Sequence, residues 1–167
     1  PRDLVRLAAE LRKVPLLREI VDTPEITLRS GAVPRTVTNR NTLVRTVPWV
    51  DGVKTGYTAA AGNVLVASGE RLGMPVFSAV MGAPSEAARD AASLELLRYG
   101  VSLYRRQAPV RQGERFAAVP LRFRDQKLPL VAARDLRLVV RRDQEVETRV
   151  RAPEEVEDER EDVPGFA

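Results

Sequence analysis

Residues 50–83, VDGVKTGYTAAAGNVLVASGERLGMPVFSAVMGA, carry the pattern that decides the fold. Three runs rich in β-branched and apolar residues, at about 50–57, 62–68 and 75–82, are separated by the short junctions Thr58–Gly62 and Gly69–Gly73. Junctions of this length join antiparallel strands, because a parallel return needs a crossover of roughly a dozen residues or more. The stretch therefore predicts a three-stranded antiparallel meander.

A long helix is predicted directly after the meander. Pro84-Ser85-Glu86 is typical of a helix start, with Ser85 or Ala83 near the cap, and the pattern continues to about residue 104. The residues expected to face the core are Ala87, Ala88, Ala91, Leu94, Leu97 and Tyr104. We expect this helix to pack on the meander.

The segment before the meander predicts two further helices and two extended pieces. Residues 2–13 have amphipathic helical spacing, and Pro15 opens a second short helix. Extended pieces are expected near 25–29 and 35–38, because Gly31 and Pro34 interrupt the chain between them. The predicted fold class is α/β (α+β), an antiparallel meander covered by helices.

The residue pattern of the sequence changes after Ala108. Short β-type runs at 116–119, 121–123, 136–140 and 146–150 predict a small all-β module. From Pro153 to Ala167 the chain holds seven acidic residues against the single base Arg160, with almost no apolar content. This tail is predicted to be disordered.

Composition excludes several kinds of chemistry. The chain of 167 residues has a formal net charge of +4 and contains neither cysteine nor histidine. Thiol catalysis, histidine-based triads and zinc sites of the usual ligand types are therefore excluded, and no metal or cofactor is expected. The arginines are spread along the chain with few aromatic residues among them, which argues against a nucleic-acid partner. Nucleophilic chemistry here would need a lysine base.

Lys54 draws attention because lysine is rare in this chain. Of the 27 basic residues only Lys13, Lys54 and Lys127 are lysines, and the other 24 are arginines. Strands often carry a lysine on their solvent face, and that is one interpretation of Lys54. The other rests on its neighbours, because Lys-Thr-Gly belongs, with Ser-x-x-Lys and a Ser-Asn element, to the signature of penicillin-binding proteins and class A β-lactamases.

Four stretches in series resemble the serine-type D-alanyl-D-alanine carboxypeptidases, the low-molecular-mass penicillin-binding proteins. They are TNRNTL (38–43), VDGVKTGYT (50–58), AGNVLVASGERLGMPVFSAVMG (61–82) and SEAARDAASLELLRYG (85–100). The resemblance runs from residue 1 to about 105 and implies a β-lactamase/transpeptidase-like fold. It further implies that residues 1–106 are the C-terminal part of a catalytic domain and that 107–152 are part of a C-terminal β domain, followed by the tail 153–167.

The resemblance assigns roles to the Lys-Thr-Gly strand, which would pair with an extended substrate. Lys54 is implied as a catalytic and substrate-binding residue whose charge lies beside the reacting centre. Thr55 would offer its hydroxyl to the terminal carboxylate of the substrate, and Gly56 would permit close approach of the substrate backbone. The amide of Tyr57 is implied as a donor in the oxyanion hole. Because strand residues alternate in direction, a site shared by Lys54 and Thr55 requires a sheet edge or a twisted strand end.

Two arginines are implied to hold the same carboxylate. They are Arg40, between two asparagines, and Arg89, early in the last helix, and a planar guanidinium suits that task. In so arginine-rich a chain the alternative for each is a solvated arginine. Trp49 is interpreted as a core or cleft-wall residue.

The implied function is removal of the terminal D-alanine from peptidoglycan stem pentapeptides through an acyl-enzyme. The implied partners are a stem peptide ending in D-Ala-D-Ala and β-lactams as inhibitors. The expected location is extracytoplasmic, in the periplasm or at the outer face of the cytoplasmic membrane, with any membrane association made through parts outside this chain. No secretion signal opens the sequence.

Two motifs of the resembled family are missing from these 167 residues. No Ser-x-Asn occurs, and no serine is followed three residues later by lysine. We therefore expect the chain to be a fragment that is inactive alone. Two alternatives stay open, a noncatalytic cell-wall-binding or scaffold protein and a class A β-lactamase. The β-type sequence after Tyr104 favours the carboxypeptidase over the β-lactamase.

Overall fold

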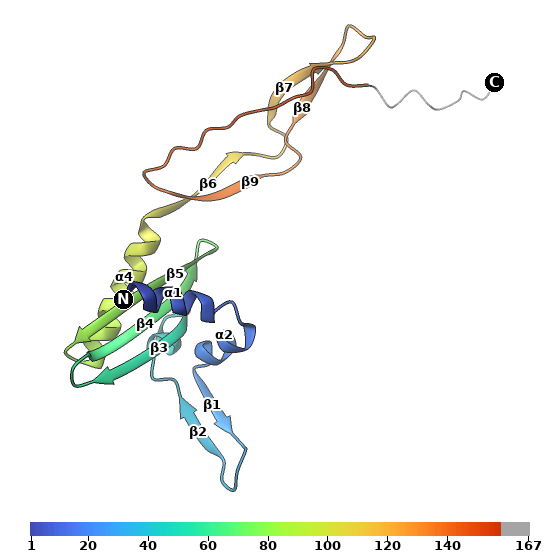
Figure 1. Ribbon diagram of the computed structural model, residues 1–167. Coiled ribbons are helices and arrows are strands. Elements are labelled where there is room, and N and C mark those ends of the chain that lie inside the picture. Colours follow the sequence, from blue (N-terminus) through green and yellow to red (C-terminus); the bar gives the residue numbers. More distant parts are fainter. Residues whose placement is uncertain (158–167) are drawn as a thin grey trace. The chain divides into compact units, whose positions relative to one another are not determined.

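A computed structural model describes residues 1–157 and divides the chain into two compact units, Pro1–Arg105 and a second that begins at Arg106. The first unit is built on β3 (Val50–Thr58), β4 (Gly62–Arg71) and β5 (Met74–Ala83). They form an antiparallel sheet in the order β3-β4-β5, so each strand pairs with the next one along the chain (Figure 1). The predicted meander is confirmed.

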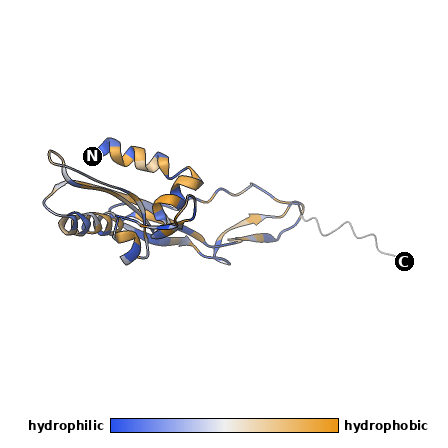
Figure 2. Ribbon diagram, turned by 90° about the horizontal axis from the view of Figure 1, so that it is seen from below, coloured by the Kyte–Doolittle hydropathy of each residue, from blue (hydrophilic) through white to orange (hydrophobic). Residues whose placement is uncertain are grey.

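Helices cover both faces of this sheet (Figures 1 and 2). On one face, α1 (Arg2–Leu11) and α2 (Pro15–Asp22) pack over a cluster formed by Ala8, Val53 and Val66. On the other face lie α3 (Leu43–Thr46) and α4 (Glu86–Ser102). The predicted fold class, an antiparallel meander covered by helices, is therefore confirmed.

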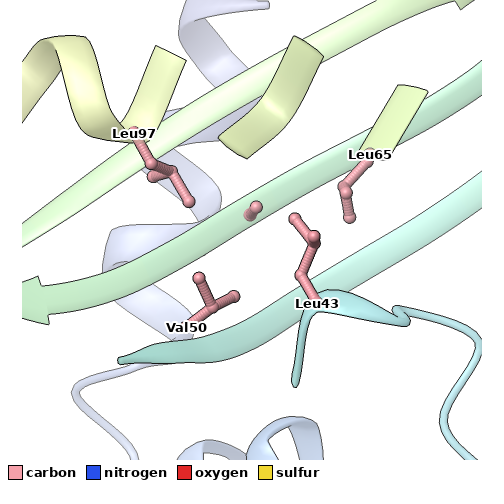
Figure 3. Packing of buried hydrophobic residues seen from close by; sticks show 5 residues of the cluster. Leu43, Val50, Leu65 and Leu97 are labelled. Carbon is pink, nitrogen blue, oxygen red and sulfur yellow. The ribbon is translucent and has the colours of Figure 1, made fainter. Parts of the chain in front are cut away.

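The larger buried cluster lies between α4 and the sheet. Figure 3 shows Leu43, Val50, Leu65 and Leu97 converging from α3, β3, β4 and α4. Leu65 and Leu97 are fully buried. Side chains from four separate elements thus meet in one core, which holds β3 at a fixed distance from α4.

The buried face of α4 agrees with the predicted one only in part. Ser85 caps the helix as expected, since its Oγ accepts a hydrogen bond from the Ala88 amide at 3.1 Å. Of the predicted core positions, Leu97 is buried and Leu94 packs against the same cluster, whereas Ala87 and Ala91 are exposed. The other buried positions of the helix are Arg89, Asp90 and Ser93. The prediction used apolar spacing alone. The face of the helix that packs on the sheet also carries Arg89 and Asp90, whose buried charges neutralise each other.

A two-stranded hairpin follows α2. It pairs β1 (Glu25–Leu28) with β2 (Arg35–Thr38), and its side chains are mostly exposed. In Figure 1 it extends away from the three-stranded sheet. Both predicted extended pieces are present, and α3, which follows the hairpin, was not predicted because it has only four residues.

The second unit contains only strands among its described residues. They are β6 (Tyr104–Val110), which starts just inside the first unit, β7 (Arg115–Pro120), β8 (Lys127–Val131) and β9 (Leu136–Arg141). β6 pairs with β9 and β7 pairs with β8. The runs 121–123 and 146–150 were predicted as strands but do not form strands. The sequence pattern did not predict β6 or β8. Apolar content alone selected those runs, but backbone pairing decides which segments become strands.

The predicted tail, 153–167, lies mostly outside the described residues. In its described part Val156 forms an isolated bridge with Leu121, and Arg122 contacts Glu155 and Glu157.

Candidate active site

The Lys-Thr-Gly segment lies on an open edge of the sheet. Within residues 1–157, β4 is the only strand that pairs with β3, so the other side of β3 is available to an extended ligand. Lys54 is directly opposite Val66 in the β3–β4 register, and Gly56 is opposite Val64. The sheet edge that a shared site requires is therefore present.

A pocket of about 300 Å³ opens beside this edge. Its walls are apolar side chains of α1, α2 and β4, together with Val53, Lys54, Thr55 and Gly56 of β3. Lys54, Thr55 and Gly56 thus line one pocket although their side-chain positions alternate along the strand. Lys54 and Gly56 are directly opposite Val66 and Val64, which line the same pocket, and Thr55 lies between them on the strand.

The polar groups of the segment face solvent. Lys54 is exposed, and its Nζ donates a hydrogen bond to the Thr55 carbonyl oxygen at 2.5 Å. Thr55 is half-buried, and the side chain of Tyr57 is 69% exposed. An ammonium group beside an apolar pocket gives a place where the charge of a bound carboxylate would be favoured.

Nothing inside the fold requires glycine at position 56. A Cβ added there would meet only the Val64 Cβ at 3.9 Å, an ordinary van der Waals contact. At Gly69, by contrast, an added Cβ would lie 2.4 Å from the Trp49 carbonyl oxygen and 2.7 Å from its ring. Gly69 is therefore required for packing, whereas Gly56 lines the pocket beside Lys54.

A buried ionic network holds the beginning of β3 against the end of α1. Arg12 Nη2 donates to Asp51 Oδ2 at 2.6 Å, and Arg12 Nη1 lies 2.5 Å from Asp51 Oδ1. Ser68 on β4 donates to the same Asp51 oxygen at 2.7 Å and accepts from Arg12 Nη1 at 3.1 Å. This network fixes the strand three residues before Lys54. Sequence reasoning missed it, because neither Arg12 nor Asp51 carries a local signal.

Asp22, at the end of α2, lies in the field of this network. Partial burial is the largest cause that raises the pKa of the Asp22 carboxyl, and the nearby charge of Asp51 raises it further. Arg12 and Arg18 act in the opposite direction without cancelling the effect.

Arg40 is exposed, and its backbone is anchored on both sides. Asn39 Nδ2 donates to the carbonyl oxygens of Val21 and Thr23, at 3.0 and 3.1 Å. Asn41 is 2% exposed and donates to the Gly52 carbonyl oxygen at 2.9 Å, two residues before Lys54. The structure therefore fixes the backbone around Arg40 near the beginning of β3, although Arg40 does not line the pocket.

Arg89 is placed differently. It is 2% exposed, and its Nε donates to Asp90 Oδ1 at 2.8 Å. The other Asp90 oxygen accepts from the Thr42 hydroxyl at 2.5 Å, which links α4 to the residue before α3. Arg89 does not line the pocket at Lys54. Its guanidinium belongs to the packing of α4.

The family described as D-alanyl-D-alanine carboxypeptidase (peptidase family S11) matches residues 1–85, which include α1, the whole sheet and the Lys-Thr-Gly segment. The chain belongs to this family.

Two curated members show how far the similarity extends. D-alanyl-D-alanine carboxypeptidase DacA of Escherichia coli K12 is 42% identical over 76 residues, which are 46% of this chain and 19% of that protein. D-alanyl-D-alanine carboxypeptidase DacF of Bacillus subtilis 168 is 31% identical over 126 residues, 75% of this chain and 32% of that protein. The chain thus spans about a fifth to a third of the length of these carboxypeptidases.

Solved structures agree with the family assignment. Penicillin binding protein 5 from Haemophilus influenzae matches with a TM-score of 0.57 and 27% identity, covering 85% of this chain and 41% of that one. The Streptomyces K15 DD-transpeptidase matches with a TM-score of 0.56 and 31% identity, covering 62% of this chain and 42% of that one. The fold is therefore that of part of a penicillin-binding transpeptidase-like domain.

Two further observations concern residues 1–157. None of their helices combines the length and apolar character needed to cross a membrane. Their acidic side chains also form no group of three or more that could hold a metal ion.

Proposed function

We propose that this chain provides the lysine-bearing wall of the active site of a serine-type D-Ala-D-Ala carboxypeptidase. The observation that carries the proposal is that Lys54, Thr55 and Gly56 line one pocket at an unpaired sheet edge. Membership of the carboxypeptidase family supports this function over that of a class A β-lactamase. In domain terms, residues 1–106 would belong to the catalytic domain and 107–152 to a C-terminal β domain.

The substrate is proposed to be a peptidoglycan stem peptide ending in D-Ala-D-Ala, bound as an extra strand along β3. The absent side chain at Gly56 would let its backbone approach. Lys54 would attract the terminal carboxylate and stabilise charge that develops in the transition state, and Thr55 would donate its hydroxyl to the carboxylate. The amide of Tyr57 would be one donor to the oxyanion.

The reaction would proceed by acyl transfer. A serine oxygen attacks the carbonyl carbon of the penultimate D-alanine, the peptide bond breaks, and D-alanine leaves with a proton. Water then hydrolyses the acyl-enzyme and restores the serine. These 167 residues contain no Ser-x-x-Lys. The nucleophilic serine and its lysine base would therefore lie in a part of the protein outside these residues. β-Lactams would acylate the same serine.

Arg40 would complete the site by attracting the terminal carboxylate, and Arg89 would support the site from within α4. Arg40 is exposed, whereas Arg89 is buried and paired with Asp90. We therefore expect loss of Arg40 to raise KM more than it lowers folding stability, and loss of Arg89 to do the reverse. The proposed location is outside the cytoplasmic membrane, where the wall substrate lies.

The first experiment uses the chain alone and a fluorescent penicillin. After denaturing electrophoresis we expect no labelled band, because the chain lacks the nucleophile. The second uses the continuous reading frame that contains this chain. If it encodes Ser-x-x-Lys and Ser-x-Asn, its product should bind penicillin covalently and release D-alanine from diacetyl-Lys-D-Ala-D-Ala. A frame without Ser-x-x-Lys would instead indicate a noncatalytic wall-binding or scaffold protein.

A further inference from the structure

A second pocket lies on the α4 side of the sheet, and it shares no residue with the pocket at Lys54. Its volume is about 320 Å³, near the lower end of the range for small-molecule sites. Trp49, directly before β3, and Arg71, at the end of β4, line one side of it, and Arg98, Val101 and Ser102 line it from α4. Arg98, Val101 and Ser102 are three and four residues apart, so they share one face of the helix.

Trp49 forms a rigid wall of this pocket. Its ring packs tightly over Gly69, where even a Cβ would be 2.7 Å from the ring, and it also packs against the cluster of Leu43, Val50 and Leu65. Its carbonyl oxygen accepts a hydrogen bond from the Glu70 amide at 3.0 Å. The indole is therefore held in place before any ligand binds, which lowers the entropy cost of binding.

Two cations face the same space. The Arg71 guanidinium carbon lies 5.6 Å from the centre of the Trp49 ring, a cation–π distance that orients this side chain. Arg98 pairs with Glu95 at 3.6 Å, but both side chains are largely exposed, 62% and 77%. An exposed pair of this kind is weak, so an incoming anion can compete for Arg98.

The rest of the lining combines polar and apolar surface. Ser102 donates its hydroxyl proton to the Tyr99 carbonyl oxygen at 2.8 Å, which orients this hydroxyl at the end of α4. Val101 and the indole supply apolar surface next to it. No acidic residue is among the lining residues. The pocket therefore suits a ligand that has a ring as well as a negative charge.

We propose that this pocket binds a sugar-sized organic anion, a hydroxylated ring that carries a carboxylate or a phosphate monoester. The two guanidinium groups hold the oxyanion, which matches their planar donor geometry. The ring of the ligand lies against Val101 and the part of the Trp49 indole that lines the pocket. This site is separate from the proposed peptide site and does not depend on acyl transfer.

The chain contains a single tryptophan, so Trp49 reports on the pocket directly. Its fluorescence, and the single indole N–H cross-peak in a nitrogen–proton NMR spectrum, are followed during titration of the 167-residue chain. The four probes are glucose 1-phosphate, glucuronate, inorganic phosphate and glucose. We expect saturable changes with glucose 1-phosphate or glucuronate in the millimolar range or below, and the stronger of the two identifies the anionic group.

Variants assign the binding to the pocket. Removal of a hydrogen bond to a charged group weakens binding about tenfold or more, so Arg71→Gln and Arg98→Gln should each have this effect. Arg2→Gln, which changes an exposed arginine on α1, is the matched control and should bind as the unchanged chain does. Inorganic phosphate should bind at least about tenfold more weakly than the sugar phosphate, because it leaves the apolar wall uncovered.

Three results would overturn the proposal. The first is the absence of any saturable signal in both measurements. The second is equal binding of inorganic phosphate and glucose 1-phosphate, which would show an adventitious ion only. The third is unchanged affinity in Arg71→Gln and Arg98→Gln, which would place the binding elsewhere on the chain.

Discussion

The Arg12 guanidinium and the Asp51 carboxylate form a two-point ion pair between the end of α1 and the beginning of β3, with Nη2–Oδ2 at 2.6 Å and Nη1–Oδ1 at 2.5 Å. Their side chains are 8% and 15% exposed. The pair determines how far the Lys54 strand lies from the helix that forms the opposite wall of its pocket. It is thus a structural support for the proposed active site.

Loss of one partner of this pair should destabilise the first unit strongly. In Asp51→Asn the buried guanidinium keeps its charge but loses its ion-pair partner, which costs about 3 kcal/mol or more in free energy of unfolding. Urea denaturation followed by Trp49 fluorescence measures this cost. The control is Lys13→Ala, which breaks the exposed pair with Glu10 and should cost less than about 1 kcal/mol. Similar losses in the two variants would show that the Asp51 pair is no stronger than a surface contact.

Alanine substitutions at two glycines of the sheet should separate function from folding. Gly56→Ala should leave the free energy of unfolding within about 0.5 kcal/mol, because the added Cβ meets only Val64. Gly69→Ala should cost about 1–3 kcal/mol, because the Cβ collides with the backbone of Trp49. In a protein that includes the nucleophile, Gly56→Ala should also lower kcat/KM. Full activity of that variant would show that no backbone approaches there.

The Asp22 carboxyl should make the fold less stable as pH rises. Its pKa is raised above 3.8 in the folded state, so the folded state binds this proton more tightly than the unfolded state does. The stability that comes from this proton is fully present below pH 3.8 and is lost as pH rises through the folded-state pKa. Asp22→Asn, which stays neutral throughout, should therefore raise the Tm at neutral pH and leave it unchanged at about pH 3.

Asp135 provides the contrasting case for an NMR titration. A hydrogen bond from the Gln112 amide, and a second from Arg137, lower the pKa of its carboxyl below 3.8. Carbon-detected titration should find Asp22 above and Asp135 below that value. The reverse order would contradict the assigned causes.

In a protein that joins this chain to a Ser-x-x-Lys element, Lys54→Ala should reduce activity more than Thr55→Ala does. Loss of a charge contact to the reacting centre costs about 2–4 kcal/mol, by comparison with removal of an oxyanion-hole donor. Lys54→Arg should be little more active than Lys54→Ala, because a wide planar guanidinium would enter the space left open beside Gly56. The measurement is kcat/KM on a D-Ala-D-Ala peptide, and near-normal activity of Lys54→Arg would show that any cation serves.

The sequence by itself determined the elements whose signals are local. Short junctions gave the β3-β4-β5 order, Pro15 and Ser85 marked the beginnings of α2 and α4, and Lys-Thr-Gly pointed to the candidate site. These signals depend on residues a few positions apart, where spacing alone decides which groups meet.

Only the tertiary structure decided the contacts between distant segments. Arg12 and Asp51 are 39 residues apart, and their pairing follows from how α1 packs on the sheet. Arg89 is buried in α4 and paired with Asp90, a contact that its predicted role at a substrate carboxylate did not include. In the second unit, β6 pairs with β9 across the β7–β8 hairpin. The physical reason is the same in each case. Burial of an unpaired charge or backbone polar group costs free energy, so each such group pairs with a partner that chain packing brings near, and the local sequence does not encode that partner.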